Sequence, residues 1–183
     1  MMEGQLLPDE REFLYNAVAE RSPSIVLEVG TWKGGGSTLQ IAMALSLNDG
    51  ILHTCELDKS LYDIAVKSYE GTLHDHRISF WNISSTELIN QLINDDRIPE
   101  FVFFDGPEDP IINMNDFKLI EKHLPIGAYF CMHDWDTGVR IDGLKSTKAV
   151  LVRPYLEQSN KWEILRSLTA PVSVGIVLAK KRS

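Results

Sequence analysis

This chain of 183 residues has a formal charge of −8 at pH 7, and 44% of its residues are hydrophobic. That length and that hydrophobic content suit one domain with a buried core, so we expect a single domain over residues 1–183, with 1–22 as an N-terminal helical segment. The negative charge opposes affinity for phosphate backbones, which argues against a nucleic-acid partner.

The sequence also predicts a cytoplasmic protein without a membrane partner. Its first residues are acidic and Pro8 interrupts the first apolar stretch, unlike the basic and apolar regions of a signal peptide. No apolar run reaches the length that spans a membrane. Cys55 and Cys131 both fall in predicted buried strands, where reduced thiols are expected rather than a disulfide.

Hydrophobic periodicity predicts a regular alternation of helices and strands. The expected strands cover residues 25–29, 51–56, 78–81, 101–104, 129–132, 162–165 and 172–178. The expected helices cover 8–19, run from 37 to the turn at 48–50, from 60 to 71, from 84 onward, from 116 to 124, and over 146–157.

Individual side chains refine these helices. The patterns Ser60-x-x-Asp63 and Ser84-x-x-Glu87 are typical of capping boxes at helix starts. The spacing of apolar residues predicts that Met43 and Ile64 belong to buried stripes of their helices. The segment 136–145, which follows the fifth strand, is expected to cover the functional site.

The strands themselves indicate the fold class. Three of them, IVLEV, FVFF and YFCM, are nearly continuous apolar runs, as expected for parallel strands that helices cover on both faces. The last two strands are joined by residues 169–171, a connection short enough for a hairpin. We therefore predict an α/β fold with a doubly wound, mainly parallel, seven-stranded sheet that ends in an antiparallel hairpin.

A glycine-rich loop follows the first strand and opens into a helix. Glycines at such a turn allow positive φ and close approach of a ligand, while the helix start offers unpaired N–H donors. The loop lacks the Gly-x-Gly-x-x-Gly order that places a pyrophosphate on the helix start, so an adenosine without a diphosphate fits better. The expected cofactor-binding residues of this loop are Gly30, Gly34, Gly35, Gly36 and Ser37.

Acidic residues stand at the ends of the predicted strands. Ligands of open parallel sheets lie beyond the carboxyl ends of the strands, where these acids should converge. Glu56 follows Gly36 by 20 residues, a separation at which a carboxylate can accept hydrogen bonds from ribose hydroxyls. Glu28 has two interpretations, as the partner of a helix cap or as a carboxylate that faces a cationic ligand.

The order of elements and the motifs resemble those of class I S-adenosylmethionine-dependent methyltransferases, most closely their small-molecule O-methyltransferase branches. The segment EVGTWKG at 28–34 resembles the cofactor loop of this family, and CELD at 55–58 resembles its ribose-binding strand end. The segments FFDG at 103–106 and GAYFCMHDW at 127–135, with Asp116 between them, are similar to the signature "DGDH…D…GG…HDW". The resemblance implies a Rossmann-like methyltransferase fold and S-adenosylmethionine as the cofactor, with Asp105 among the residues that hold it.

The chain also departs from the family pattern: it has one more glycine before Ser37, Ala128 in place of a second glycine, and differences at Ser84 and Glu108. Ser84 stands where the family often has an acid that contacts adenine, so we expect Ser84, Ser85 and the backbone to bind adenine. Glu108 stands where the usual histidine follows Asp-Gly.

Two routes could remove the proton from an acceptor hydroxyl. His133 could take it directly, because the ordinary pKa of histidine lies near the working pH, and His133 and Asp105 are therefore the expected catalytic residues. Alternatively, resemblance to metal-dependent O-methyltransferases implies that Asp105, His133 and Asp134 hold a divalent cation. Mg²⁺ prefers oxygen ligands, so an imidazole ligand would favour Mn²⁺, Fe²⁺ or Zn²⁺, or no metal.

The predicted function is transfer of a methyl group from S-adenosylmethionine to a hydroxyl oxygen of a small-molecule acceptor. Two alternatives stay open. One is a non-catalytic nucleoside-binding partner subunit. The other is an NAD-dependent oxidoreductase, which is less favoured because the Gly-x-Gly-x-x-Gly motif is absent. The outer hairpin offers a surface through which two copies could form a homodimer.

Overall fold

The computed structural model describes residues 4–136, 146–169 and 173–183. Within them, seven strands form one sheet in the order β3-β2-β1-β4-β5-β7-β6. The strands are β1 (Ile25–Val29), β2 (Ile51–Cys55), β3 (Ile78–Trp81), β4 (Phe101–Phe104), β5 (Tyr129–His133), β6 (Trp162–Leu168) and β7 (Ile176–Lys181). β3, β2, β1, β4 and β5 are parallel, whereas β7 pairs antiparallel with both β5 and β6. The predicted fold class is confirmed.

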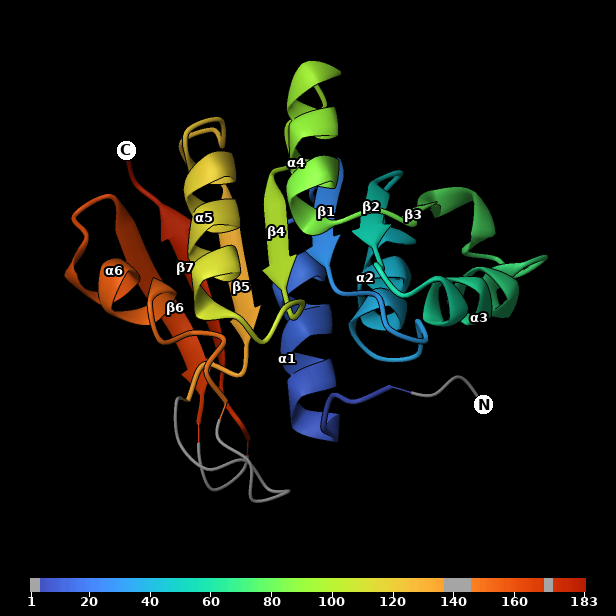
Figure 1. Cartoon of the computed structure of the whole chain (residues 1–183), viewed down its shortest axis with the longest axis horizontal. Coiled ribbons are helices and arrows are strands. Elements are labelled where there is room, and N and C mark those ends of the chain that lie inside the picture. Colours follow the sequence, from blue (N-terminus) through green and yellow to red (C-terminus); the bar gives the residue numbers. More distant parts are fainter. Residues whose placement is uncertain (1–3, 137–145, 170–172) are drawn as a thin grey trace.

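Helices cover both faces of the sheet. They are α1 (Pro8–Ala19), α2 (Ser37–Leu45), α3 (Lys59–Tyr69), α4 (Ser85–Asn94), α5 (Pro110–Glu121) and α6 (Val152–Gln158), with a short 3₁₀ helix at Asp75–Arg77. Figure 1 shows α4 and α5 in front of the strands, and α1 and α2 behind them. No helix of the described residues is both long and apolar enough to cross a membrane.

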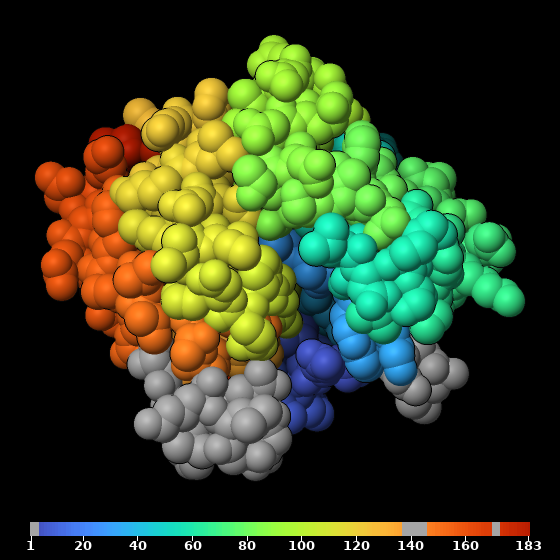
Figure 2. All heavy atoms as spheres, viewed as in Figure 1, coloured from blue at the N-terminus to red at the C-terminus, as the bar shows by residue number. Residues whose placement is uncertain are grey.

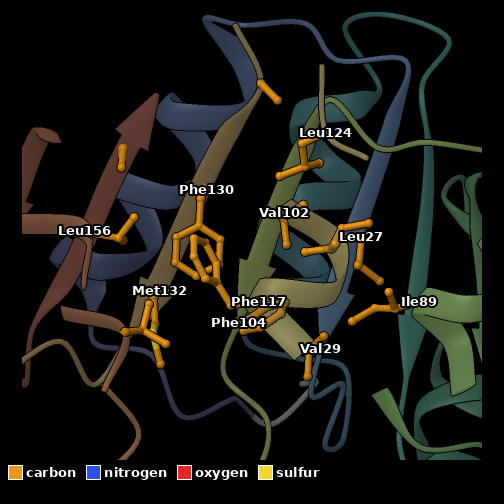
Figure 3. Close-up of a cluster of buried hydrophobic side chains, with 14 of the residues drawn as sticks. Leu27, Val29, Ile89, Val102, Phe104, Phe117, Leu124, Phe130, Met132 and Leu156 are labelled. Atoms are coloured by element: carbon orange, nitrogen blue, oxygen red, sulfur yellow. The ribbon is translucent and has the colours of Figure 1, made fainter. Parts of the chain in front are cut away.

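The core is divided into two clusters by the sheet, one beneath each helical layer. The cluster under α4, α5 and α6 contains Phe104, Phe117 and Phe130, which Figure 3 shows side by side. The rings of Phe117 and Phe130 meet edge to face with their centroids 4.7 Å apart. Leu14 and Ile41 belong to the other cluster, under α1, α2 and α3. Because β1 and β4 are buried on both faces, their sequences are apolar throughout except at Glu28.

Several helix boundaries differ from those predicted. α3 begins after Asp58, whose side chain accepts hydrogen bonds from the N–H groups of Ser60 and Leu61, so the predicted Ser60–Asp63 capping box is wrong. Asp63 instead forms an ion pair with Lys59 at 2.5 Å. α5 begins at Pro110 rather than at residue 116, because Asp109 caps the helix and proline suits its first turn.

The remaining differences concern exposure and the last third of the chain. Met43 and Ile64 are 41% and 45% exposed, so their predicted burial is wrong: the buried stripes of α2 and α3 run through other residues. α6 begins at Val152, after turns rather than a helix over 146–151. β6 is longer than predicted and β7 begins later, at Ile176. The predicted hairpin connection at 169–171 and the covering segment 136–145 fall largely outside the described residues.

Candidate functional site

A cavity of about 550 Å³ lies beyond the carboxyl ends of β1, β2 and β4. The strand order reverses between β1 and β4, which is where open α/β sheets bind ligands. Figure 2 shows the hollow between the start of α5 and α3, with blue N-terminal residues at its edge. Gln5 and Leu6 supply that edge, and Leu61 and Ile112 supply apolar walls.

The glycine loop forms one wall of this cavity. Gly30 has a φ of +97°, and a Cβ built on it would lie 2.6 Å from the carbonyl oxygen of Asp105. Only glycine therefore fits between β1 and β4 at this point. Gly36 and Ser37 also line the cavity. Gly34 does not line it, since its carbonyl oxygen accepts a hydrogen bond of 2.6 Å from the hydroxyl of Tyr69.

Gly35 is also away from the cavity wall. A Cβ on Gly4 would lie 2.4 Å from its carbonyl carbon, which shows that the N-terminal segment packs directly on the loop. Gly34 and Gly35 thus shape the loop, and the structure gives no support for direct cofactor contacts by either.

Glu28 lies beneath the loop and not in the cavity wall. It is fully buried, and its Oε2 accepts hydrogen bonds of 2.7 Å from the hydroxyls of both Thr38 and Thr54. Burial raises the pKa of Glu28 to about 7, although hydroxyl donors oppose the shift. This placement fits the first interpretation of Glu28, as the partner of a helix start, because its hydrogen bonds connect α2 and β2 to β1. A direct contact with the cofactor has no support in the structure.

Glu56 reaches the cavity from the residue after β2. Its Oε2 accepts a hydrogen bond of 2.9 Å from the N–H of Trp32, and its Oε1 accepts one of 2.9 Å from the N–H of Asp58. A carboxylate has about four lone-pair positions, so roughly two remain for a ligand. These contacts hold the carboxylate of Glu56 at the wall of the cavity.

Ser84, Ser85 and Thr86 line the cavity at the start of α4. Ser84 caps the helix and forms the predicted capping box, in which its hydroxyl donates a hydrogen bond of 2.6 Å to Oε2 of Glu87. The hydroxyls of Ser85 and Thr86 donate to the carboxylate of Asp116, which is 1% exposed. All three hydroxyl protons are therefore committed within the protein, so a ligand would find oxygen acceptors and backbone groups here.

The predicted acidic cluster forms at the ends of β4 and β5. Asp105, His133 and Asp134 offer ligand atoms that all lie within 4.8 Å of one another. Asp105 lines the cavity, whereas His133 and Asp134 do not. His133 is 6% exposed, and its Nε2 lies 3.1 Å from Oε2 of Glu10. Its Nδ1 lies 3.3 Å from Oδ1 of Asp105.

These surroundings oppose the predicted role of His133 as a base. Burial disfavours its charge, but the carboxylates of Asp105 and Glu10 outweigh burial and raise the pKa of His133 to about 10. The imidazole is then protonated at neutral pH and holds no lone pair for a substrate proton. Burial also disfavours the charge of Asp105, yet His133 and Lys148 hold the pKa of this carboxyl well below its usual range, which makes it a weak base.

Comparison with known proteins identifies the family. The model of a family described as O-methyltransferase matches residues 2–182. This chain belongs to the O-methyltransferase family. The predicted resemblance is thereby confirmed at the level of the family.

One curated relative of this O-methyltransferase family member matches at low sequence identity. The Arabidopsis thaliana protein named "Putative caffeoyl-CoA O-methyltransferase" is 28% identical over 115 residues, which cover 62% of this chain and 49% of the relative. The chain thus spans about half the length of the curated relative that it matches.

Two solved structures share the fold. The O-methyltransferase from Bacillus cereus, in complex with SAH, has a TM-score of 0.79 at 21% identity, over 97% of this chain and 83% of that one. The O-methyltransferase TomG from Streptomyces achromogenes, in complex with SAM, has a TM-score of 0.76 at 20% identity, over 98% and 82%.

Two residues of this O-methyltransferase family member were missed by sequence reasoning. Lys148 lines the cavity with a side chain only 7% exposed, and its Nζ lies 2.7 Å from Oδ1 of Asp105. No motif surrounds Lys148, and its partner is 43 residues away, so the sequence carries no local signal for it. Glu10 stands in the first turn of α1, where an acid suits the helix dipole, and this ordinary explanation hid its complete burial.

Proposed function

We propose that this chain transfers a methyl group from S-adenosylmethionine to a hydroxyl oxygen of a small-molecule acceptor. The observation that carries the proposal is the cavity at the switch point of an O-methyltransferase family member, with Gly30 on one side and the carboxylate of Glu56 on another. Its volume of about 550 Å³ lies in the range of sites for small molecules and cofactors.

The residues around the cavity fit this cofactor. Gly30 has no side chain, so a ligand can approach its backbone closely. A Cβ at this position would lie 2.6 Å from the carbonyl oxygen of Asp105. Glu56 keeps carboxylate lone pairs for sugar hydroxyls, and the start of α4 presents backbone groups and the hydroxyl oxygens of Ser85 and Thr86 for the base. We therefore assign the ribose to Glu56 and the adenine to the segment 84–86, with Gly36 and Ser37 at the opening of α2.

Transfer requires an aligned acceptor oxygen that gives up its proton. When bound, S-adenosylmethionine supplies a methyl group on a positively charged sulfur, and the acceptor oxygen forms the new bond to carbon while the sulfur keeps the electron pair. Asp105 and Glu108 line the cavity, and the carboxylate of Glu108, whose side chain is 63% exposed, can take the proton of the acceptor hydroxyl and pass it to water. The pKa of His133 is raised to about 10, so its imidazole is protonated at neutral pH. It therefore stabilises the charge of the Asp105 carboxylate and cannot act as the base.

The proposal is tested first by binding. Calorimetry on the purified chain should show heat for S-adenosylmethionine and its demethylated product, and none for NAD. Glu56→Gln should weaken binding about tenfold, because it removes the charge and one acceptor position while nearly preserving shape. Glu70→Gln, on an exposed residue at the end of α3, is the matched control and should bind as the wild type does.

Transfer itself is tested with radiolabelled methyl donor and a panel of phenols, sugars and carboxylic acids. Product in any hydroxyl-bearing member supports the proposal. Binding of the donor without transfer to the whole panel would support the non-catalytic partner subunit instead. Absence of heat for both donor and demethylated product, in folded protein, would end the proposal.

Several further statements stay predictions from the sequence. They are the cytoplasmic location, the single domain over 1–183, the lack of nucleic-acid and membrane partners, and the homodimer. Size-exclusion chromatography with light scattering would test the homodimer directly.

A further inference from the structure

The ammonium of Lys148 contacts the carboxylates of both Asp105 and Asp134. Its Nζ lies 2.7 Å from Oδ1 of Asp105 and 3.1 Å from Oδ2 of Asp134. These two carboxylates belong to the set of three side chains that would form the predicted metal site. The ammonium therefore already makes the contacts that a divalent cation would need from both carboxylates.

The third member of that set, His133, has a carboxylate oxygen close to each of its nitrogens. A ligating imidazole must turn an unprotonated nitrogen toward the ion. Here Nε2 lies 3.1 Å from Oε2 of Glu10 and Nδ1 lies 3.3 Å from Oδ1 of Asp105. Each nitrogen thus lies next to a carboxylate oxygen without the geometry of a hydrogen bond, and the oxygen nearest to Nδ1 is the one that Lys148 contacts.

The backbone around Lys148 is held in place. The hydroxyl of Thr147 donates a hydrogen bond of 2.8 Å to the carbonyl oxygen of Glu108, and the side chain of Asn113 donates one of 3.4 Å to the carbonyl oxygen of Lys148. Asn113 is itself 1% exposed. These contacts hold the turn at residues 147–148 against the start of α5. The backbone that carries the Lys148 side chain is therefore fixed next to Asp105 and Asp134.

Charge also disfavours a metal ion at this point. A divalent cation between Asp105 and Asp134 would stand within a few ångströms of the ammonium of Lys148, and like charges at that separation repel strongly away from water. To admit the ion, Lys148 would have to leave a pocket in which its side chain is 7% exposed.

We propose that the ammonium of Lys148 takes the place of a divalent cation in this site, so that the chain binds no such ion there and an acceptor oxygen meets Lys148 instead. The second half of this proposal rests on the proposed methyl transfer. Lys148 and Asp105 both line the cavity, so the ammonium is within reach of a ligand. Its Nζ lies 3.5 Å from Oε1 of Glu108, whose side chain is 63% exposed, and an acceptor oxygen can replace this long contact.

This arrangement favours a particular class of acceptor. An ammonium is a point charge with three donors. Its two short contacts are with the carboxylates of Asp105 and Asp134, and its other contacts are long, 3.4 Å to the carbonyl oxygen of Asp105 and 3.5 Å to Oε1 of Glu108. One acceptor oxygen can replace these long contacts and be stabilised as it becomes negative. The favoured acceptor carries a single ionising hydroxyl and needs no second oxygen to chelate an ion.

The test is metal uptake by the full chain after treatment with a chelator and dialysis. Mn²⁺ is titrated into the protein and the signal of free Mn²⁺ is followed by electron paramagnetic resonance. The wild type should remove no more Mn²⁺ than Lys161→Met, which deletes an exposed lysine near β6. Lys148→Met should bind Mn²⁺ about 100-fold more tightly than the wild type, because a positive charge next to two carboxylates has been removed.

Adding Asp134→Asn to Lys148→Met should abolish the gained site. A wild-type protein that binds one equivalent of Mn²⁺ or Zn²⁺, and loses it with Asp134→Asn, overturns the proposal. If Lys148→Met does not fold, the wild-type titration with and without Asp134→Asn still decides between these two outcomes.

An activity measurement adds a second arm once an acceptor is known. Methyl transfer by the wild type should keep its rate in excess chelator, and Lys148→Met should lose it about 100-fold. A wild-type rate that falls with chelator and returns with Mn²⁺ overturns the inference. Binding of the demethylated cofactor product is measured in the same samples, so failure of the proposed function is distinguished from failure of the Lys148 assignment.

Discussion

Glu10 of α1 and His133 of β5 join the first helix to the centre of the sheet, with Oε2 of Glu10 lying 3.1 Å from Nε2 of His133. Glu10 is fully buried, and its other oxygen, Oε1, accepts a hydrogen bond of 2.6 Å from the hydroxyl of Ser173. Burial disfavours its charge, but His133 and these donors hold the pKa of Glu10 below its usual value. One buried carboxylate thus connects the N-terminal helix, the fifth strand and the segment before β7.

Replacing Glu10 should therefore be costly to stability. We expect Glu10→Ala to lower the free energy of unfolding by about 3 kcal/mol, because it removes the carboxylate beside Nε2 of the buried His133 and the acceptor of the Ser173 hydroxyl. Glu12→Gln, on an exposed residue of the same helix, should change it by less than about 0.5 kcal/mol. Urea unfolding gives both values, and equal stabilities for the two variants would refute the assigned role.

Glu28 should make stability depend on pH. Burial raises the pKa of Glu28 to about 7 from an ordinary 4.5, so the folded chain holds a proton that the unfolded chain has released in this interval. Stability from this group is therefore present at low pH and declines as the pH rises toward 7, by up to about 3 kcal/mol.

The variant Glu28→Gln isolates this effect, since an amide keeps the shape of the protonated carboxyl but does not titrate. The difference in unfolding free energy between Glu28→Gln and the wild type should shift in favour of the variant between about pH 5 and about pH 8. Urea unfolding at both values measures it. A difference that does not change with pH would show that Glu28 has the same pKa in both states.

Sequence patterns were sufficient for the sheet but not for all helix ends. Continuous apolar runs such as 101–104 occur where a strand is covered on both faces, so the central strands were found within a residue or so. The start of α5 was missed although Asp109 followed by Pro110 is itself a start signal, because the apolar spacing from residue 116 was given more weight. β7 pairs with two strands, and its boundaries follow from that pairing more than from its own composition.

The sequence likewise predicts only some of the residues of the candidate site. Gly30, Glu56 and Asp105 were predictable because each stands at a strand end that the fold brings to one edge of the sheet. The protonation of His133 and the position of Lys148 were not predictable, since both depend on residues that are distant in the sequence. The protonation of His133 depends on Glu10, and Lys148 comes to the acids from a turn with no motif of its own.

Ser84 offers a test of how adenine is held. Its hydroxyl serves the helix cap and Glu87, so Ser84→Ala should cost about 1 kcal/mol of stability while leaving affinity for the demethylated cofactor product within about twofold. Ser68→Ala, on a half-buried serine inside α3, controls for loss of a hydroxyl outside a cap. Calorimetric binding and urea unfolding give the two quantities. A loss of affinity of about tenfold would restore the Ser84 hydroxyl as a direct ligand contact.

Gly30 and Gly127 form a matched pair that separates backbone strain from the site. Both have positive φ, +97° and +91°, but a Cβ on Gly30 would lie 2.6 Å from the carbonyl oxygen of Asp105, whereas one on Gly127 would meet nothing within 4 Å. Each alanine variant should lose about 1 kcal/mol from φ alone, and Gly30→Ala should lose more because β1 and β4 must separate. Since Gly30 also lines the cavity, Gly30→Ala should abolish measurable binding of the demethylated cofactor product, and Gly127→Ala should bind as the wild type does. Calorimetry at a temperature where both variants are folded decides the matter. Equal affinities in the two variants would mean that the cofactor does not lie against Gly30.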